Sequence, residues 1–132
     1  MAQPGGSETD FDALAAGRRR DAEDLLASAP RGDFRRALAA LAVPGLRLIG
    51  PQGQQGYGHE LLVQIMESDL LAGVRQRLAA VTAGQRVTIL ECDLFSPPSD
   101  PGHCPPGVLW LIRSSGDGIE RIRLFHPEQR AA

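Results

Sequence analysis

The sequence has no lysine, only two cysteines and no long apolar run. All 14 basic residues are arginine, and together with abundant alanine this usage indicates a GC-rich bacterial genome. Cys92 and Cys104 form neither a C-x-x-C pair nor a secretory disulfide framework, so we expect two reduced thiols. No segment approaches the roughly twenty apolar residues of a membrane span, and MAQPGGSETD at the N-terminus is not a secretory signal. These absences predict a cytoplasmic protein with no membrane partner.

An excess of charge of one sign is also absent. The formal net charge is -2 at pH 7, and the GRRR at residues 17–20 is a small local cluster, so we expect no nucleic-acid partner. The 132 residues, 42% of them hydrophobic, are enough for one domain with a real core. We predict a disordered tail at residues 1–8, a single domain at residues 9–127 and a flexible C-terminus at residues 128–132.

Three segments of the first half show the apolar spacing of amphipathic helices. The first runs from Thr9 to Pro30, the second runs from Asp33 to the VPG of residues 43–45, and the third ends at Gly73. The short strand LRLIG and the Gly/Gln-rich turn PQGQQGYG lie between the second and the third. The first half is therefore mainly helical.

From Val74 the apolar period changes from helical to alternating. RQRLAAVT and RVTILECDLF flank AGQ, and GVLWLIR and IERIRLF flank SSGDG, which predicts two antiparallel hairpins. The predicted fold class is α+β, with two or three N-terminal helices packed on a curved, mostly antiparallel sheet. Apolar residues occupy both faces of ILECDLF and VLWLI, and one helical layer covers only one face. We expect a homodimer to bury the other.

Two carboxylates interrupt the apolar strand VTILECDLF, residues 87–95. Glu91 and Asp93 are two positions apart, so their side chains share one face of the strand. If that face lines an apolar pocket, the carboxylates raise each other's pKa and leave one acid and one base. The alternative is a solvated strand end, or ion pairs with an arginine on a neighbouring strand such as Arg77 or Arg123. The pattern leaves both interpretations open, the catalytic pair and the solvated or ion-paired strand end.

The order of these elements resembles a known superfamily. GLRLIGPQGQQGYGHELLVQIM, followed by a long hairpin and the terminal VLWLIRSSGDGIERIRLFHP, resembles the SnoaL-like branch of the nuclear transport factor 2-like superfamily over roughly residues 34–127. The resemblance implies a cone-shaped α+β barrel with a deep pocket between the helices and the concave sheet, usually in a homodimer. Similar proteins include polyketide cyclases, steroid isomerases, epoxide hydrolases and non-catalytic ligand-binding domains, so the function depends on the site.

A histidine and a tyrosine lie just before the third predicted helix. His59 and Tyr57 are placed to orient a substrate oxygen at the mouth of the cone, although a histidine at a helix N-terminus is often only structural. HELLV is not the zinc motif H-E-x-x-H, because Val63 occupies the position of the second histidine. We expect no cofactor.

The proline-rich loop at residues 96–107 contains a second histidine and a cysteine. His103 and Cys104, taken with Cys92, match no closed zinc arrangement, so we expect no metal. With its five prolines the loop is stiffer than a random linker, and it is a candidate lid over the pocket or a cover for a dimer edge.

The remaining candidates are ligand-binding residues. Trp110, in the middle of a strand, is predicted to be a core residue first and a stacking platform second. Tyr57, Arg77 and Arg123 complete the predicted ligand-binding set.

Two functions remain open. One is a cofactor-independent isomerase, cyclase or hydrolase that binds a hydrophobic small molecule, with Glu91, Asp93 and His59 as catalytic residues. The other is a non-catalytic ligand-binding or dimerisation module in a regulatory pathway.

Overall fold

The computed structural model describes residues 8–127, in which three helices pack on one six-stranded sheet. The helices are α1 (Glu8–Ser28), α2 (Phe34–Leu41) and α3 (Glu60–Ala72). The strands are β1 (Ala42–Ile49), β2 (Gln55–Tyr57), β3 (Arg75–Ala83), β4 (Val87–Phe95), β5 (Gly107–Ser115) and β6 (Gly118–Phe125). The predicted α+β class is confirmed. The predicted tail at residues 1–8 and the predicted C-terminal segment at residues 128–132 lie outside the described residues, apart from Glu8, where α1 begins.

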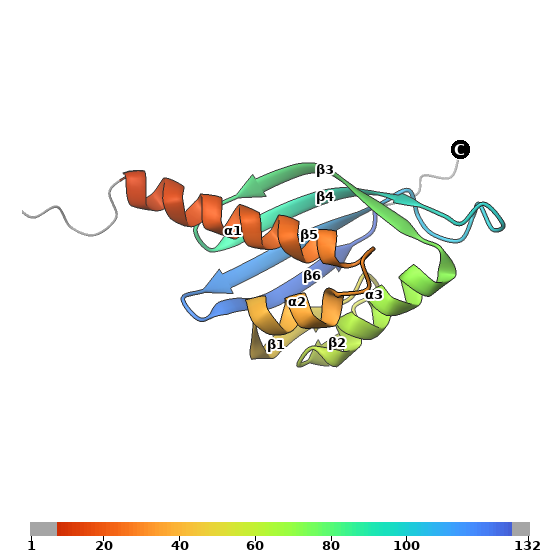
Figure 1. The fold of residues 1–132 in the computed structure, drawn as a ribbon, viewed down its shortest axis with the longest axis horizontal. Coiled ribbons are helices and arrows are strands. Elements are labelled where there is room, and N and C mark those ends of the chain that lie inside the picture. The colour runs from red at the N-terminus through yellow and green to blue at the C-terminus, as the bar shows by residue number, and fades with distance from the viewer. Residues whose placement is uncertain (1–7, 128–132) are drawn as a thin grey trace, which may run out of the picture.

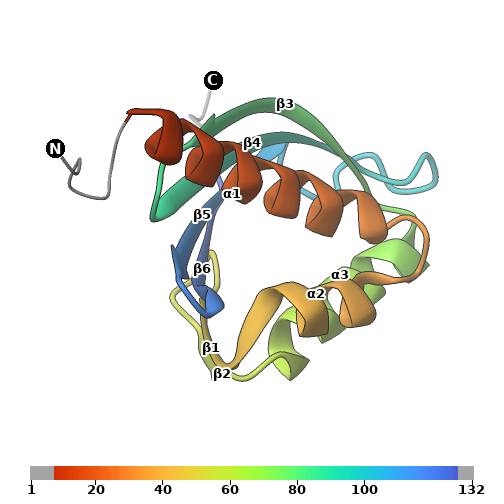
Figure 2. The same cartoon turned by 60° about the vertical axis from the view of Figure 1, so that its left-hand side comes forward.

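The strands are ordered β2-β1-β6-β5-β4-β3, and the sheet is open because β2 and β3 are its two edges. All neighbouring strands are antiparallel except β1 and β6, which run parallel. Figure 1 shows the helices on one side of this sheet, and Figure 2 shows the sheet curving from β3, beside α1, round to β1 and β2, beside α3. The curvature and the open side filled by helices agree with the predicted cone.

Each strand therefore has an inner face toward the helices and an outer face away from them. On β5 the buried side chains alternate with partly exposed ones, as the period of two in a strand requires. The inner face and the helices share one core, whose most deeply buried apolar residues are Leu25, Leu38, Leu46, Leu48, Leu62, Val63, Leu90, Trp110, Ile112 and Ile122. The outer face has no layer packed on it within the described residues.

The predicted hairpins and the helix ends near Pro30 and Gly73 are found, with three differences in detail. The VPG of residues 43–45 does not end the second helix but lies within β1, because α2 ends at Leu41. Gly73 ends α3 in the left-handed conformation, with φ of 88°, as predicted. Asp33 precedes α2, but its side chain makes no capping hydrogen bond. The turn PQGQQGYG contains a short strand, β2, whose three residues are too few to produce a recognisable alternation.

Gly118, at the β5–β6 turn, should tolerate no side chain. Its φ is 130°, and a Cβ atom there would lie 2.7 Å from the carbonyl oxygen of Leu41. We expect Gly118→Ala to lower the free energy of unfolding by about 1–3 kcal/mol in a urea titration. Gly116→Ala is the matched control, because Gly116 has no positive φ and no atom near its Cβ position. Equal losses in the two variants would contradict this argument.

Candidate functional site

Two adjoining cavities lie between the helices and the inner face of the sheet. The first, here called the inner cavity, has a volume of about 220 Å³ and lies between α3 and strands β3 to β6. The second, here called the α1 cavity, has a volume of about 460 Å³ and lies between α1, α3 and the start of β3. Both are lined by Met66, Asp69 and Gln76. A concave apolar space with a few polar groups is the usual form of a small-molecule site.

Asp69 is the acidic group of the inner cavity. It follows Leu62 and Met66 at helical spacings of seven and three residues, so it continues the stripe of α3 that faces the core. Burial raises the pKa of this carboxyl group above its ordinary value, and the nearby His103 and His126 offset part of the rise. Asp69 thus holds its proton at a higher pH than an exposed carboxyl group does.

His126 lines the same cavity from the end of β6. The residue as a whole is exposed, yet its ring is packed closely enough that burial lowers its pKa, while the charge of Asp69 acts in the opposite direction. The pKa values of Asp69 and His126 therefore move toward one another. Two titratable groups in one apolar cavity, the acid with a raised pKa and the histidine with a lowered one, suit proton transfer between them.

Gln76 and Trp110 add polar groups to the lining, as do Gln52 and Gln54 from the loop between β1 and β2. The indole Nε1 of Trp110 donates a hydrogen bond to Oε1 of Gln76 over 3.2 Å. The amide Nε2 of Gln76 lies 3.9 Å from the sulfur of Met66. The amide is thereby held between α3 and β5. Most of the other lining side chains of this cavity are apolar, among them Ile65, Leu94, Val108 and Leu124.

Glu91 and Asp93 lie on the outer face, away from both cavities. Glu91 is exposed, and Asp93 accepts a hydrogen bond of 2.9 Å from Nη2 of Arg77 on the neighbouring strand. The face that carries Thr88, Leu90 and Cys92 is the one that meets the core. The paired acids are therefore not brought into a cavity, and the ion pair with Arg77 is the alternative that the sequence left open. Their catalytic role remains a sequence-based prediction that this placement does not support.

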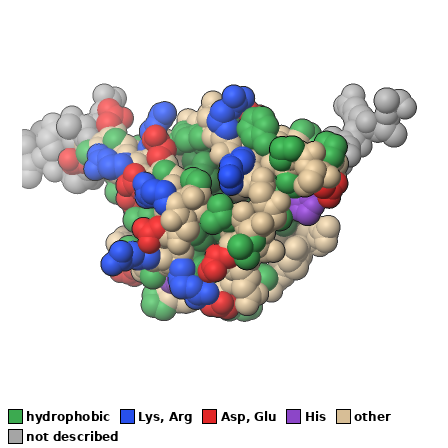
Figure 3. Space-filling model, turned by 45° about the vertical axis from the view of Figure 1, so that its right-hand side comes forward, with side chains coloured by type: hydrophobic (Ala, Val, Ile, Leu, Met, Phe, Trp, Pro, Cys, Tyr) green, Lys and Arg blue, Asp and Glu red, His purple; other side chains and the backbone are tan. Residues whose placement is uncertain are grey.

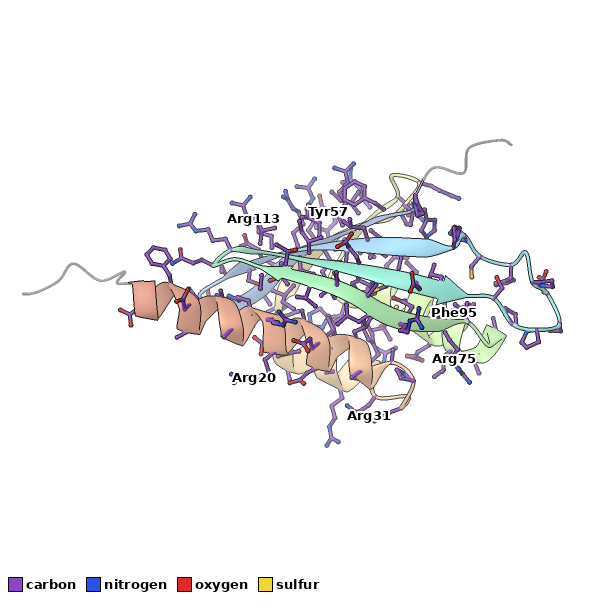
Figure 4. All side chains as sticks on the ribbon, turned by 90° about the horizontal axis from the view of Figure 1, so that it is seen from above. Arg20, Arg31, Tyr57, Arg75, Phe95 and Arg113 are labelled. Carbon is purple, nitrogen blue, oxygen red and sulfur yellow. The ribbon has the colours of Figure 1, made fainter. Side chains whose placement is uncertain are left out.

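The other predicted site residues are also dispersed, except for Trp110. His59 immediately precedes α3, and its Nε2 lies 2.8 Å from the carbonyl oxygen of Val43 in β1. Tyr57 is 74% exposed beneath the guanidinium of Arg47, and Arg123 lies over the ring of Phe125 on the outer face. Figure 4 shows Tyr57 on the side of the sheet away from α1. His59, Tyr57, Arg77 and Arg123 line neither cavity.

Sequence reasoning missed Asp69, Gln76 and His126, although each left a signal. Asp69 occupies a core-facing position of an otherwise apolar helical stripe, where a carboxylate is unusual. Gln76 precedes Leu78 on the inner face of β3, and His126 continues the face of Ile122 and Leu124. All three are polar residues at positions where the spacing of their apolar neighbours directs the side chain toward the core.

Metal and thiol chemistry find no support in the described part of the chain. Within residues 8–127, no group of three or more His, Cys, Asp or Glu side chains is placed to hold a metal ion. Cys92 and Cys104 are free thiols, as predicted. Burial, with a smaller contribution from Asp93, raises the pKa of Cys92 to about 11, so its nucleophilic thiolate is scarce at neutral pH.

None of the described helices is long and apolar enough to cross a membrane.

No protein-family profile and no curated protein matches this sequence. Solved structures match in fold. A candidate SnoaL-like polyketide cyclase from Jannaschia sp. CCS1 aligns with a TM-score of 0.68 at 15% identity, over 94% of this chain and 90% of that one. SalBIII, an epoxide hydrolase/cyclase-like enzyme of pyran ring formation in the polyether salinomycin, aligns with a TM-score of 0.68 at 13% identity, over 85% and 92%.

A nuclear transport factor 2-like protein of unknown function from Cytophaga hutchinsonii aligns with a TM-score of 0.65 at 12% identity, over 83% of this chain and 88% of that one. At such identities the likeness concerns the fold. The predicted resemblance is confirmed at that level: the chain has the nuclear transport factor 2-like fold, which SnoaL-like proteins share.

Proposed function

We propose that this protein binds a hydrophobic small molecule in the inner cavity and catalyses a cofactor-independent proton transfer, as an isomerase, cyclase or hydrolase. One observation carries the proposal: Asp69, with a pKa raised by burial, shares an apolar cavity with His126. Proteins of the same fold include the candidate polyketide cyclase and the epoxide hydrolase/cyclase-like enzyme described above, which supports this class of chemistry.

The groups of the cavity suggest a division of roles. The carboxylate of Asp69 accepts a proton from a carbon next to a carbonyl group, which its raised pKa makes it better able to do. The amide N–H groups of Gln76 are neutral donors for the carbonyl oxygen as negative charge develops on it. His126 takes this proton from Asp69 and returns it to another atom of the product, which restores both groups to their starting states.

Hydrogen–deuterium exchange tests the proposal without a known substrate. In D2O, the protein should accelerate the loss of protons beside the carbonyl of 2-butanone, followed by NMR. The rate should rise with pH as Asp69 ionises, with a midpoint above 3.8, its ordinary pKa. If the protein binds the ketone but proton exchange is no faster than in buffer alone, the non-catalytic ligand-binding module is favoured instead.

The outer face supports the proposed homodimer. Ile89, Leu109 and Leu111 are only partly exposed there. The same face carries acids on β4 and arginines on β1, β5 and β6, and Figure 4 shows Arg113 projecting from it. Two copies related by a twofold axis would place these opposite charges against one another around an apolar centre.

Light scattering after size exclusion tests the dimer. We expect the wild type to have twice the chain mass of 14.1 kDa, and Leu111→Asp, on the outer face, to have the mass of one chain. Leu71→Asp is the control, because Leu71 is 89% exposed on α3. A monomeric wild type at micromolar concentration would refute the dimer.

We also propose a cytoplasmic bacterial location without a nucleic-acid partner. Basic and acidic side chains are interspersed on the face drawn in Figure 3, so that face has no continuous area of one sign. Within GRRR, Arg18 donates hydrogen bonds to the carbonyl oxygens of Gln85 and Ser115, and Arg19 pairs with Glu23. These contacts fit a structural role for the cluster.

A further inference from the structure

Gln76 lies where the two cavities adjoin. It lines both of them, together with Met66 and Asp69, and it reaches from β3 toward the side chains of α3 and β5. Its amide has a contact on each side, with the indole N–H of Trp110 and with the sulfur of Met66. A side chain so held is placed as a partition between the inner cavity and the α1 cavity.

We propose that Gln76 is a specificity-determining residue that limits the length of the ligand. The inner cavity then receives a compact molecule with its carbonyl group near Asp69 and His126. The larger α1 cavity, about 460 Å³ against about 220 Å³, lies beyond the partition and is closed to an alkyl tail that starts in the inner cavity. The placement of the carbonyl group rests on the proposed function, whereas the partition does not.

The hydrogen bond with Trp110 explains why the partition stays closed. Trp110 is 1% exposed and its indole N–H donates to Gln76, so the donor loses this acceptor when Gln76 turns away. A buried donor left without an acceptor reduces the population of such a conformer by roughly 5- to 150-fold. The amide therefore acts as a fixed wall for a ligand that brings no acceptor of its own to this point.

Straight-chain 2-alkanones from 2-butanone to 2-undecanone measure the length limit. Trp110 is the only tryptophan in the chain and lines the inner cavity, so its fluorescence reports binding. In the wild type, affinity should rise with the first methylene groups and then level off. In Gln76→Ala it should keep rising by about four-fold for each further methylene group, because the tail enters the α1 cavity.

Three further variants separate the partition from other effects. Gln76→Met has a similar length but accepts no hydrogen bond from Trp110, so its side chain turns away more often and the plateau should be weaker than in the wild type. Gln76→Asn is one methylene shorter and should move the plateau to longer chains, which provides a second test if the alanine variant does not fold. Gln64→Ala removes an exposed glutamine from α3 and should bind like the wild type.

Several results would overturn the inference. The affinity of the wild type could rise with chain length without a plateau. Gln76→Ala or Gln76→Asn could show the wild-type plateau. The wild type and Gln76→Ala could both fail to bind any alkanone. Proton exchange is measured separately, so the two proposals fail in different ways. If the protein does not accelerate proton exchange, but the wild type and Gln76→Ala still differ in the alkanone length at which affinity levels off, only the acid–base role of Asp69 is removed.

Discussion

Asp69→Asn should reduce the exchange of protons beside the carbonyl of 2-butanone by about 100- to 10,000-fold. Asparagine keeps the size and the polarity of Asp69 but cannot accept the proton at neutral pH. The affinity for the ketone should change little, because the apolar walls of the cavity provide most of the contact. NMR of the exchange and tryptophan fluorescence of the binding measure the two effects on the same sample.

The variant should also be no less stable than the wild type at neutral pH. A carboxyl group whose folded pKa is raised contributes stability below its unfolded pKa and loses that contribution as the pH rises through the folded pKa. The melting temperature of Asp69→Asn relative to the wild type should therefore increase between pH 4 and pH 7. A large loss of stability would mean that Asp69 holds the fold together and is not a functional group.

Matched substitutions distinguish Asp69 from the other acids. Asp117→Asn removes an exposed carboxylate in the β5–β6 turn and should leave the exchange rate unchanged. The double variant of Glu91→Gln with Asp93→Asn tests the outer-face pair directly. If that double variant abolished exchange and Asp69→Asn did not, the sequence-based assignment would be correct and our proposed site would be wrong.

Trp110→Ala should lower the free energy of unfolding by about 3–5 kcal/mol. Trp110 is 1% exposed in the middle of the sheet, and its ring lies 6.5 Å from that of Phe34 in a tilted arrangement. Removing the indole leaves a cavity in the core and takes the hydrogen-bond donor from Gln76. Urea denaturation followed by far-UV circular dichroism measures the loss, because the variant has no tryptophan fluorescence.

Trp110→Phe separates packing from hydrogen bonding at the same position. Phenylalanine retains most of the buried ring but has no N–H, so the loss should be about 1–2 kcal/mol. Leu71→Ala, at a position that is 89% exposed, should change the stability by less than about 0.5 kcal/mol. If Trp110→Ala had as small an effect as Leu71→Ala, Trp110 would not be the centre of the core.

The local patterns of the chain predicted its elements well. The two hairpins around AGQ and SSGDG, the glycine stop at Gly73 and the α+β class all follow from short-range rules of spacing, turns and helix ends. The resemblance to SnoaL-like proteins likewise depended on the order of these elements, and the fold confirmed it. The parallel pairing of β1 with β6 joins segments some seventy residues apart, so no local pattern contains it.

The candidate site was predicted less well, because both faces of the central strands are apolar. Alternation showed that Glu91 and Asp93 share a face of β4 and that Leu90 and Cys92 share the other. It did not show which face meets the helices. Asp69, on a helix, and His126, after the last strand, were too far apart in the sequence to be recognised as one cluster.

The sequence by itself determined the elements, the turns and the sorting of side chains into two faces, because each depends on contacts between near neighbours in the chain. Only the tertiary structure decided which face became the interior. Helices α1 to α3 cover the face of Trp110 and Leu90 and leave the carboxylates of VTILECDLF outside, where Asp93 pairs with Arg77. The same packing brings Asp69 and His126 to one cavity, since burial of the core determines which distant side chains meet.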